Sequence, residues 1–199
     1  MGKIPWSLLI LAGLLLYLQP QARAAIVFID FEGLNDSDPV TNQYPGLNFS
    51  NTIALSAGIS LNEFEFPPHS GTNVVSDNGG PISIVFAIPV LSFSGYFTYV
   101  EPLTLVGFDA LNNQVASAAS AFSSNDALFG DPGSSPNEFL QVSFAGGISS
   151  VTITGDPLAG SFVMDDITYT TASVPEPSST YLFLSGVVTL LSLRRKLFL

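Results

Sequence analysis

The sequence predicts an all-β domain, an antiparallel β-sandwich. Apolar residues recur with a period of two along most of the chain, as in Val27, Ile29 and Phe31, and no window shows the period of an amphipathic helix. Clusters of Gly, Pro, Asn and Asp separate these short alternating runs. Roughly eight to ten short strands spaced in this way are typical of a sandwich, and the absence of an internal repeat disfavours a propeller or solenoid.

The first expected strands lie before residue 82. The strand expected at 27–32 alternates apolar residues with two acids, which predicts one buried face and one face exposed to solvent. Strands at 46–51 and 60–66 are expected next. The Asp-Asn-Gly-Gly-Pro cluster at 77–81 is then a strong turn signal that separates them from the following strands.

The remaining expected strands are again delimited by turn residues. These turns are Glu101-Pro102, Asn112-Asn113, Asp131-Pro132-Gly133, Gly146-Gly147 and Gly155-Asp156-Pro157. An Ala-rich piece near 115–121 is the most ambiguous between strand and helix. We expect the strands at 82–88, 91–100, 103–110, 114–122, 138–145, 149–154 and 161–170.

The N-terminus is typical of a cleavable signal peptide. Lys3 supplies a positive start, 6–18 is a nearly unbroken apolar run, and Ala22-Arg23-Ala24 fits an A-x-A cleavage pattern. We therefore expect residues 1–24 to be removed after Ala24.

The C-terminal sequence indicates a linker followed by a short apolar helix and a basic end. Pro175 and Pro177 hold the chain extended. The apolar run at 181–193 is shorter than the roughly 17 to 25 residues of an ordinary spanning helix. The basic cluster at 194–196 favours a cytoplasmic end, which leaves the domain outside. An ordinary tail anchor and an amphipathic surface helix are the alternatives.

Together these features resemble a known sorting signal. The Val174-Pro175-Glu176-Pro177 segment, the short apolar run and the Arg194-Arg195-Lys196 cluster are similar to the PEP-CTERM signal, the substrate tag of the exosortase system in Gram-negative, biofilm-forming bacteria. The resemblance implies a sorting signal at 174–199 and an exported domain at 25–173. It also implies processing by a signal peptidase and an exosortase-type enzyme. The protein would be held in the inner membrane during transit and then reach the cell surface or extracellular matrix.

The exported domain contains no basic side chain other than one histidine. All five Lys and Arg residues lie in the two targeting segments, whereas every acid except Glu176 lies between them. Nucleic acids and anionic membrane surfaces need cationic partners, so both are excluded as ligands. A partly buried carboxylate must then accept hydrogen bonds, raise its pKa or bind a cation such as calcium. The alternative is that most of these acids are solvated and maintain solubility.

Four segments of the domain resemble the ectodomains common among PEP-CTERM proteins. They are the Phe-Glu-Gly-Leu opening at 31–34, the segment 44–50, the Phe-Ser-Gly-Tyr-Phe run at 93–97 and the closing 162–167. Such ectodomains are in turn similar to galactose-binding-type jelly rolls, the architecture of many carbohydrate-binding modules. The resemblance implies a jelly-roll-like sandwich, although fold alone does not establish function.

The same resemblance implies a structural calcium where the first strand and its following loop meet the last strand. Calcium prefers six to eight oxygen ligands, and this region is rich in acids. Strict alternation would send Asp165 to the face of Ile167 and Asp166 to the face of Met164, which leaves one of the two as a ligand. The candidate metal ligands are Glu32, Asp36, Asp38, Asp165 and Asp166.

We expect no catalytic residue. The chain has one histidine, His69, and no cysteine, which removes a cysteine nucleophile and a zinc cluster. No Gly-x-Ser-x-Gly elbow accompanies the histidine. A carboxylate pair for glycoside hydrolysis is defined by a separation in space, so a hydrolase stays a lesser alternative.

Aromatic side chains give the remaining indication of a ligand. The one Trp lies in the signal segment, and we expect Tyr96 and Tyr99 to pack in the core. Tyr44, in a probable loop, is the candidate ligand contact. The sequence thus favours an exported, non-catalytic surface or matrix protein that binds carbohydrate, such as an exopolysaccharide. A structural or adhesive biofilm protein without a specific ligand is the alternative.

Overall fold

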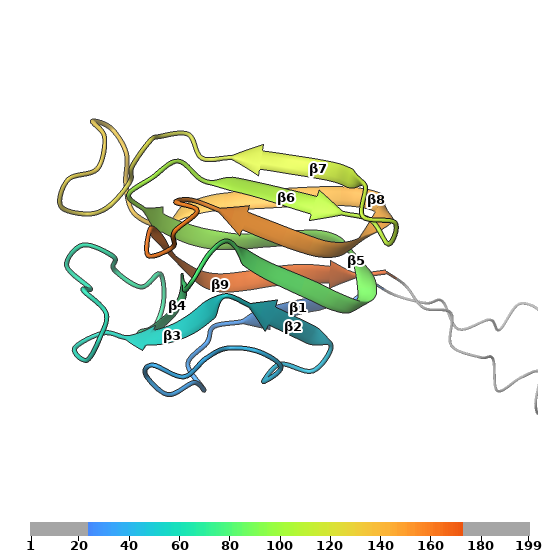
Figure 1. Ribbon diagram of the computed structural model, residues 1–199, viewed down its shortest axis with the longest axis horizontal. Coiled ribbons are helices and arrows are strands. Elements are labelled where there is room, and N and C mark those ends of the chain that lie inside the picture. Colours follow the sequence, from blue (N-terminus) through green and yellow to red (C-terminus); the bar gives the residue numbers. More distant parts are fainter. Residues whose placement is uncertain (1–23, 173–199) are drawn as a thin grey trace, which may run out of the picture. The chain divides into compact units, whose positions relative to one another are not determined.

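Residues 24–172, which the computed structural model describes, form nine strands and no helix. All but the last residue of the expected signal peptide, and the whole expected sorting signal at 174–199, lie outside the described residues. No helix in the described part is long and apolar enough to cross a membrane. The strands are β1 (Ile26–Ile29), β2 (Leu47–Ser50), β3 (Thr52–Ser56), β4 (Asn73–Asp77), β5 (Ile82–Tyr99), β6 (Thr104–Phe108), β7 (Gln114–Ala119), β8 (Glu138–Thr154) and β9 (Phe162–Thr171) (Figure 1).

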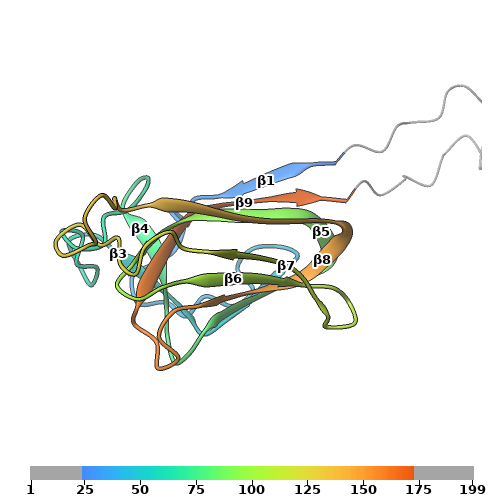
Figure 2. The same ribbon diagram turned by 90° about the horizontal axis from the view of Figure 1, so that it is seen from above.

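The long strands β5 and β8 take part in both layers of a sandwich. Residues 82–86 of β5 pair with β2 and β8, whereas residues 90–99 pair with β9 and with the beginning of β8. One layer is therefore β2–β5–β8–β6–β7, called here the β6 layer. The other is β3–β4–β9–β5–β8, with β1 also paired to β9, and is called here the β9 layer (Figure 2).

The bend between the layers lies where Pro89 of β5 meets Gly147 of β8. The register of the β5–β8 pair shifts between Val85 and Val90, and Gly147 has a φ of 94°. A Cβ atom on Gly147 would lie 2.9 Å from the Cβ of Pro89. Glycine is therefore required for the close approach as well as for the positive φ.

The core fills the space between the two layers. Alternate residues of β5 and β8 point inward, and aromatic and branched side chains dominate the inward set. The largest fully buried side chains are Tyr99, Phe31, Phe49, Phe93, Phe97, Phe162, Ile82, Ile84, Leu103, Leu105, Ile148 and Ile153.

The all-β, antiparallel prediction is confirmed for the described residues, but several strands differ from those expected. The expected strands at 82–88 and 91–100 are one continuous β5, and those at 138–145 and 149–154 are one continuous β8. Strands β3 and β4 were not expected. All five residues of β4 are buried, so this strand carries no alternation to find.

The strand expected at 60–66 is wrong. The Asn62 carbonyl accepts hydrogen bonds from the backbone N–H groups of Glu65 and Phe66, at 3.1 and 2.8 Å. The Asn62 side chain also donates to the Glu65 carboxylate. An asparagine that closes a tight turn in this way outweighs a weak alternation of Phe and Glu.

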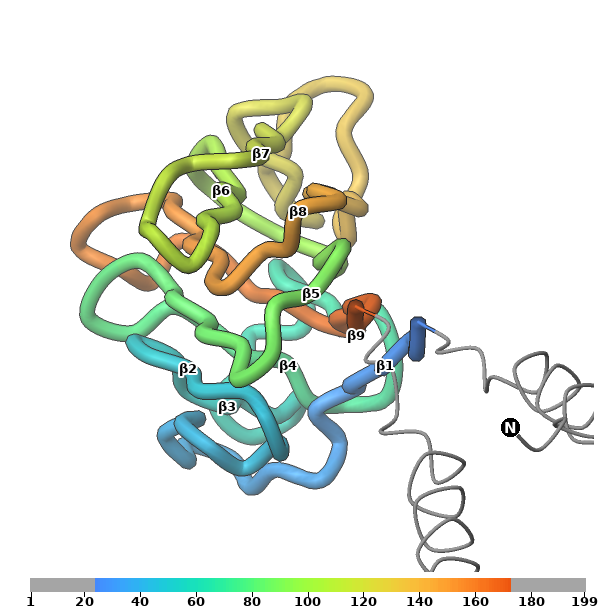
Figure 3. The backbone as a smooth tube through the Cα atoms, turned by 90° about the vertical axis from the view of Figure 1, so that its right-hand side faces the viewer, coloured from blue at the N-terminus to red at the C-terminus, as the bar shows by residue number. Residues whose placement is uncertain are grey.

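The two ends of the described chain lie side by side. The Thr171 N–H donates to the Ala25 carbonyl at 2.8 Å, and β1 runs antiparallel to the end of β9 (Figure 3). Two long loops, 57–72 and 120–137, lie at the opposite end of the sandwich (Figures 1 and 2). The Ala127 N–H joins these loops by donating to the Glu65 carbonyl at 2.9 Å.

Replacement of Gly147 by alanine tests the bend. A Cβ atom at position 147 would be strained at the positive φ and would lie too close to Pro89. G147A is therefore expected to lower the free energy of unfolding by about 2–4 kcal/mol. Gly133 also has a positive φ, 88°, but a Cβ there meets nothing within 4 Å, so G133A is the control and costs about 1–2 kcal/mol. Denaturant unfolding measures both values, and equal costs would show that the Pro89 contact has no role.

Candidate functional site

A β-bulge in β9 brings two acids to the same side of the β9 layer. Between the pairs Ser94↔Thr168 and Tyr96↔Asp165, β9 contains one more residue than β5. Asp166 occupies the bulge with a φ of 48°, a conformation that Asp tolerates better than most residues. Met164 before the bulge and Ile167 after it both pack in the main core. The expectation that Asp165 and Asp166 lie on opposite faces is therefore wrong, because the bulge resets the alternation.

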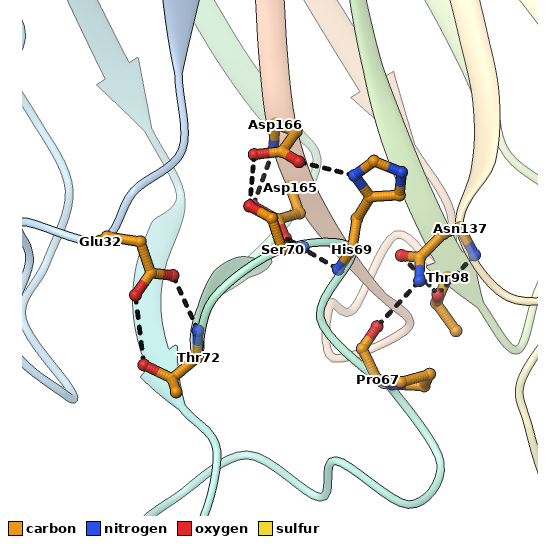
Figure 4. A network of polar contacts seen from close by, with 9 residues as sticks. All are labelled: Glu32, Pro67, His69, Ser70, Thr72, Thr98, Asn137, Asp165 and Asp166. Carbon is orange, nitrogen blue, oxygen red and sulfur yellow. Dashed lines mark hydrogen bonds and ion pairs between the residues drawn. The ribbon is translucent and has the colours of Figure 1, made fainter.

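Both acids bind the same two residues of the 57–72 loop (Figure 4). One Asp165 oxygen accepts the backbone N–H groups of His69 and Ser70, at 2.8 and 2.9 Å. Asp166 accepts a hydrogen bond from the Ser70 hydroxyl at 2.8 Å and contacts His69 Nδ1 at 2.6 Å. Asp165 and Asp166 are buried, with 1% and 5% of their surface exposed. The two carboxylates thus fix the loop on the outer face of β9.

Burial raises the pKa of Asp165 to about 6. The negative charge of the adjacent Asp166 acts in the same direction, whereas the backbone N–H groups of Ser70, Asp166 and His69 oppose it. Since the folded pKa lies above the ordinary value of 3.8, protonated Asp165 stabilises the fold at low pH. That contribution is present below pH 3.8 and is lost as the pH rises through about 6.

The His69 ring is the first of three aromatic rings in contact. Its Nδ1 atom contacts the Asp166 carboxylate, and the other ring nitrogen faces away from it (Figure 4). The His69 ring stacks on Tyr96, with 3.5 Å between ring centroids and 10° between planes. Tyr96 in turn contacts Phe139 at 5.3 Å. The His69 side chain is 35% exposed and Phe139 is 50% exposed, so this aromatic cluster reaches solvent.

Beyond the aromatic cluster, the outer face of the β9 layer is lined by small polar side chains. Ser94 of β5 pairs with Gln141 of β8 and Thr168 of β9, and the next row pairs Ser92 with Ser143 and Thr170. Gln141 and Ser143 are exposed. At the β1 edge, the outward Phe28 and Ile26 are 58% and 75% exposed. We call the aromatic cluster and these two polar rows the outer site.

Asn137 connects the outer site to the loops. Its side-chain amide donates to the Pro67 carbonyl at 3.2 Å, and its backbone N–H donates to the Thr98 hydroxyl at 3.0 Å (Figure 4). This arrangement holds the segment before His69 against the start of β8. The position of the aromatic cluster is thus fixed from both β9 and β8.

The other predicted metal ligands lie elsewhere and bind their own partners. Glu32 accepts the backbone N–H groups of Thr72 and Asn73, at 2.9 and 2.8 Å. Asp36 accepts from Ser60 and Ser56, and these hydrogen bonds, above all that from Ser60, hold its pKa below its ordinary value although burial acts to raise it. Asp38 accepts from the Asn35 side chain.

The five acids are therefore held by separate partners instead of forming one set. Within residues 24–172, no group of three or more His, Cys, Asp or Glu side chains is arranged to hold a metal ion. The five predicted ligands are thus not gathered into one group of carboxylates, and calcium binding stays a prediction.

The tyrosines are distributed differently from the expectation. Tyr99 is fully buried, as expected, but Tyr96 lies on the outer face. Tyr44 is half-buried and packs edge-on against Phe31 at 5.7 Å between ring centroids. Burial, with the nearby charges of Asp30 and Glu32, raises the pKa of Tyr44 to about 12. These contacts show a packing role for Tyr44, and its contact with a ligand stays a prediction.

The raised pKa of Asp165 can be measured directly. A carboxyl titration followed by ¹³C NMR is expected to give a midpoint near pH 6 for Asp165. Asp126 is an internal control. Burial works to raise its pKa, but hydrogen bonds from Ser124, Phe129 and Leu128 together hold it below the ordinary value. A midpoint near 4 for Asp165 would contradict the buried environment described here.

No protein-family model matches this chain, and no curated protein matches it. Three solved structures are similar in fold. The K1 cleaved adhesin domain of Lys-gingipain from Porphyromonas gingivalis has a TM-score of 0.44 at 9% identity, over 74% of this chain and 99% of that one. A DUF4465 family protein from Bacteroides caccae has 0.45 at 11%, over 74% and 100%. A family 29 carbohydrate binding module has 0.42 at 12%, over 77% and 96%. At these TM-scores the likeness carries no argument about function.

Proposed function

We propose that this protein is an exported, non-catalytic cell-surface or matrix protein whose outer site binds carbohydrate. The observation that carries the proposal is the exposed aromatic cluster of His69, Tyr96 and Phe139 beside two rows of polar side chains. A sugar ring has an apolar face of C–H groups and an edge of hydroxyls. The aromatic cluster of the outer site matches the apolar face, and the polar rows match the hydroxyls.

Each part of the outer site has a distinct role in this proposal. The exposed Phe139 ring supplies a flat apolar surface at little cost in conformational entropy, since it is already held against Tyr96. Gln141 offers both an amide donor and a carbonyl acceptor, and the hydroxyls of the at least partly exposed Ser92, Ser143, Thr168 and Thr170 do the same. Ser94, which belongs to the first row, is buried and donates to the Thr168 carbonyl. The His69 nitrogen turned away from Asp166 adds a further polar group at the aromatic end.

The hydrogen bonds of the outer site support binding rather than catalysis. Ser70 donates to Asp166 and not to the His69 ring, so Ser70, His69 and Asp166 do not form a nucleophile–base relay. Glycoside hydrolysis needs two carboxyl groups that face each other across the scissile bond. Asp165 and Asp166 instead bind one loop from the same side.

The route to the cell surface is the second part of the proposal. It is supported by the resemblance of the 174–199 segment to a PEP-CTERM signal and by the signal-peptide pattern at 1–24. In this proposal an exosortase-type enzyme acts on the C-terminal segment after export. Calcium enters the proposal as a structural ion, and binding experiments in calcium and in chelator test it.

An adhesive role without a specific sugar is a second candidate. It is favoured by three apolar side chains on the two long loops, Phe64, Leu128 and Phe129, which are 74%, 53% and 80% exposed. The hydrogen bond between Ala127 and Glu65 brings their parts of the loops together. In that case retention by surfaces would depend on this loop end and not on the outer site.

Substitution of Phe139 tests the carbohydrate proposal. F139S removes an exposed ring and leaves the core intact, so the affinity for a bound polysaccharide is expected to fall about tenfold or more. The control is L111S, which removes an 82% exposed side chain from the β6–β7 turn. Titration calorimetry of the purified protein against polysaccharide from the producing organism measures both variants. Unchanged affinity in F139S would move the binding function away from the outer site.

Processing of the chain is tested by mass spectrometry of the protein recovered from the cell surface. The expected N-terminal residue is Ala25, because cleavage follows the Ala22-Arg23-Ala24 pattern. Replacement of Pro175 and Pro177 by alanine is expected to leave that N-terminus unchanged and to trap the protein in the inner membrane. Normal surface delivery of this double variant would contradict the sorting proposal.

A further inference from the structure

We infer that the glycan bound by the outer site is uncharged, an inference that rests on the carbohydrate-binding function proposed above. The polar groups that the two rows offer to a ligand are neutral hydroxyls and one amide, from Ser92, Gln141, Ser143, Thr168 and Thr170. No Lys or Arg occurs between residues 25 and 175. The site therefore has neutral donors and acceptors but no fixed cation for an anionic sugar.

The one side chain that can become cationic is already paired. His69 bonds to the buried carboxylate of Asp166, and Asp165 lies directly beside it. Proteins bind carboxylate, sulfate and phosphate groups chiefly through Arg, Lys or arrays of backbone N–H groups. The backbone N–H groups of His69 and Ser70, which could form such an array, are both used by Asp165.

The charges around the outer site act against an acidic polymer. Asp165 and Asp166 lie beneath the His69 ring on this face, whereas Glu138, next to Phe139, turns to the opposite face and accepts a hydrogen bond from the Tyr99 hydroxyl. They belong to a domain that has many acidic side chains and no Lys or Arg. Salt screens buried charges less than exposed ones, so a uronic acid stacked on Phe139 would experience repulsion from Asp165 and Asp166.

Bridging by a divalent cation does not remove this barrier at the two bulge acids. Asp165 and Asp166 are 1% and 5% exposed, and both already accept hydrogen bonds from the 57–72 loop. A cation between them and a bound polymer would have to displace His69 and Ser70. The chemistry of the site thus selects neutral hexose or pentose chains over uronate, sulfated or pyruvylated ones.

The test uses pairs of polymers with the same backbone, one neutral and one carboxymethylated, and varies the salt concentration to isolate the effect of charge. Neutral cellulose-, xylan-, mannan- and dextran-type polysaccharides are compared with the carboxymethyl derivative of each, by affinity electrophoresis and calorimetry in chelator. At least one neutral polymer is expected to bind, and its carboxymethyl derivative is expected to bind about tenfold more weakly. Raising the salt concentration is expected to narrow that difference.

A charge-introducing variant tests the same inference in the opposite direction. Gln141 is exposed in the middle of the site, and Q141K is expected to strengthen binding of the carboxymethyl polymer about fivefold or more. T104K changes the net charge equally but places the lysine on an exposed position of β6, in the other layer, and is expected to have a smaller effect.

The outcomes separate the two proposals. Binding of carboxymethyl polymers as tightly as neutral ones by the unmodified protein would overturn the inference and leave the carbohydrate-binding function standing. Binding of no polymer by the folded protein would overturn the proposed function, and the inference would fall with it. Equal gains in Q141K and T104K would show that only the overall charge matters, and this would also overturn the inference.

Discussion

The fold depends on satisfying buried carboxylates in a domain without Lys or Arg. Asp77, Asp126, Asp165 and Asp166 are buried, and no buried side-chain polar atom in the described residues lacks a hydrogen-bond partner. The donors are backbone N–H groups, hydroxyls and one imidazole. Asp77, at the end of β4, accepts from Ser161 and from the first residue of β9. Asp126 accepts from neighbours in its own loop, whereas Asp77, Asp165 and Asp166 accept from distant segments and so connect loops with strands.

The bulge in β9 places two of these buried acids under the outer site. A regular strand would have sent one of its two adjacent acids into the apolar core, where an ionised group is costly. The inserted residue turns both acids outward, and His69 and Ser70 then cover them. As a result, the His69 ring lies flat on Tyr96. The aromatic cluster is thus a consequence of how two carboxylates are accommodated, and its geometry is set by hydrogen bonds from β9.

Much of the sandwich could be predicted from the sequence, because β1, β2 and the halves of β5 and β8 alternate visibly. The strand β4 could not, since full burial removes the alternation. The bulge at Asp166 was hidden as well, because no pattern in a single sequence marks an inserted residue. The outer position of Tyr96 could have been predicted, because in an alternating strand it lies on the same face as the polar Ser92, Ser94 and Thr98 of β5. The pairing of His69 with Asp166 joins residues 97 positions apart, and such a contact is set by topology.

The side-by-side ends of the described chain determine how the domain would respond to mechanical force. If the segment after Thr171 is fixed at the cell surface, a pull on a ligand in the outer site is transmitted from the Asp165–Asp166 bulge along β9 to that attachment. β9 is hydrogen-bonded to β1 and β4 on one edge and to β5 on the other. Antiparallel hydrogen bonds are perpendicular to the strands, so this load shears many of them at once instead of opening them one by one. The domain is therefore loaded in the direction in which a sheet resists extension most strongly.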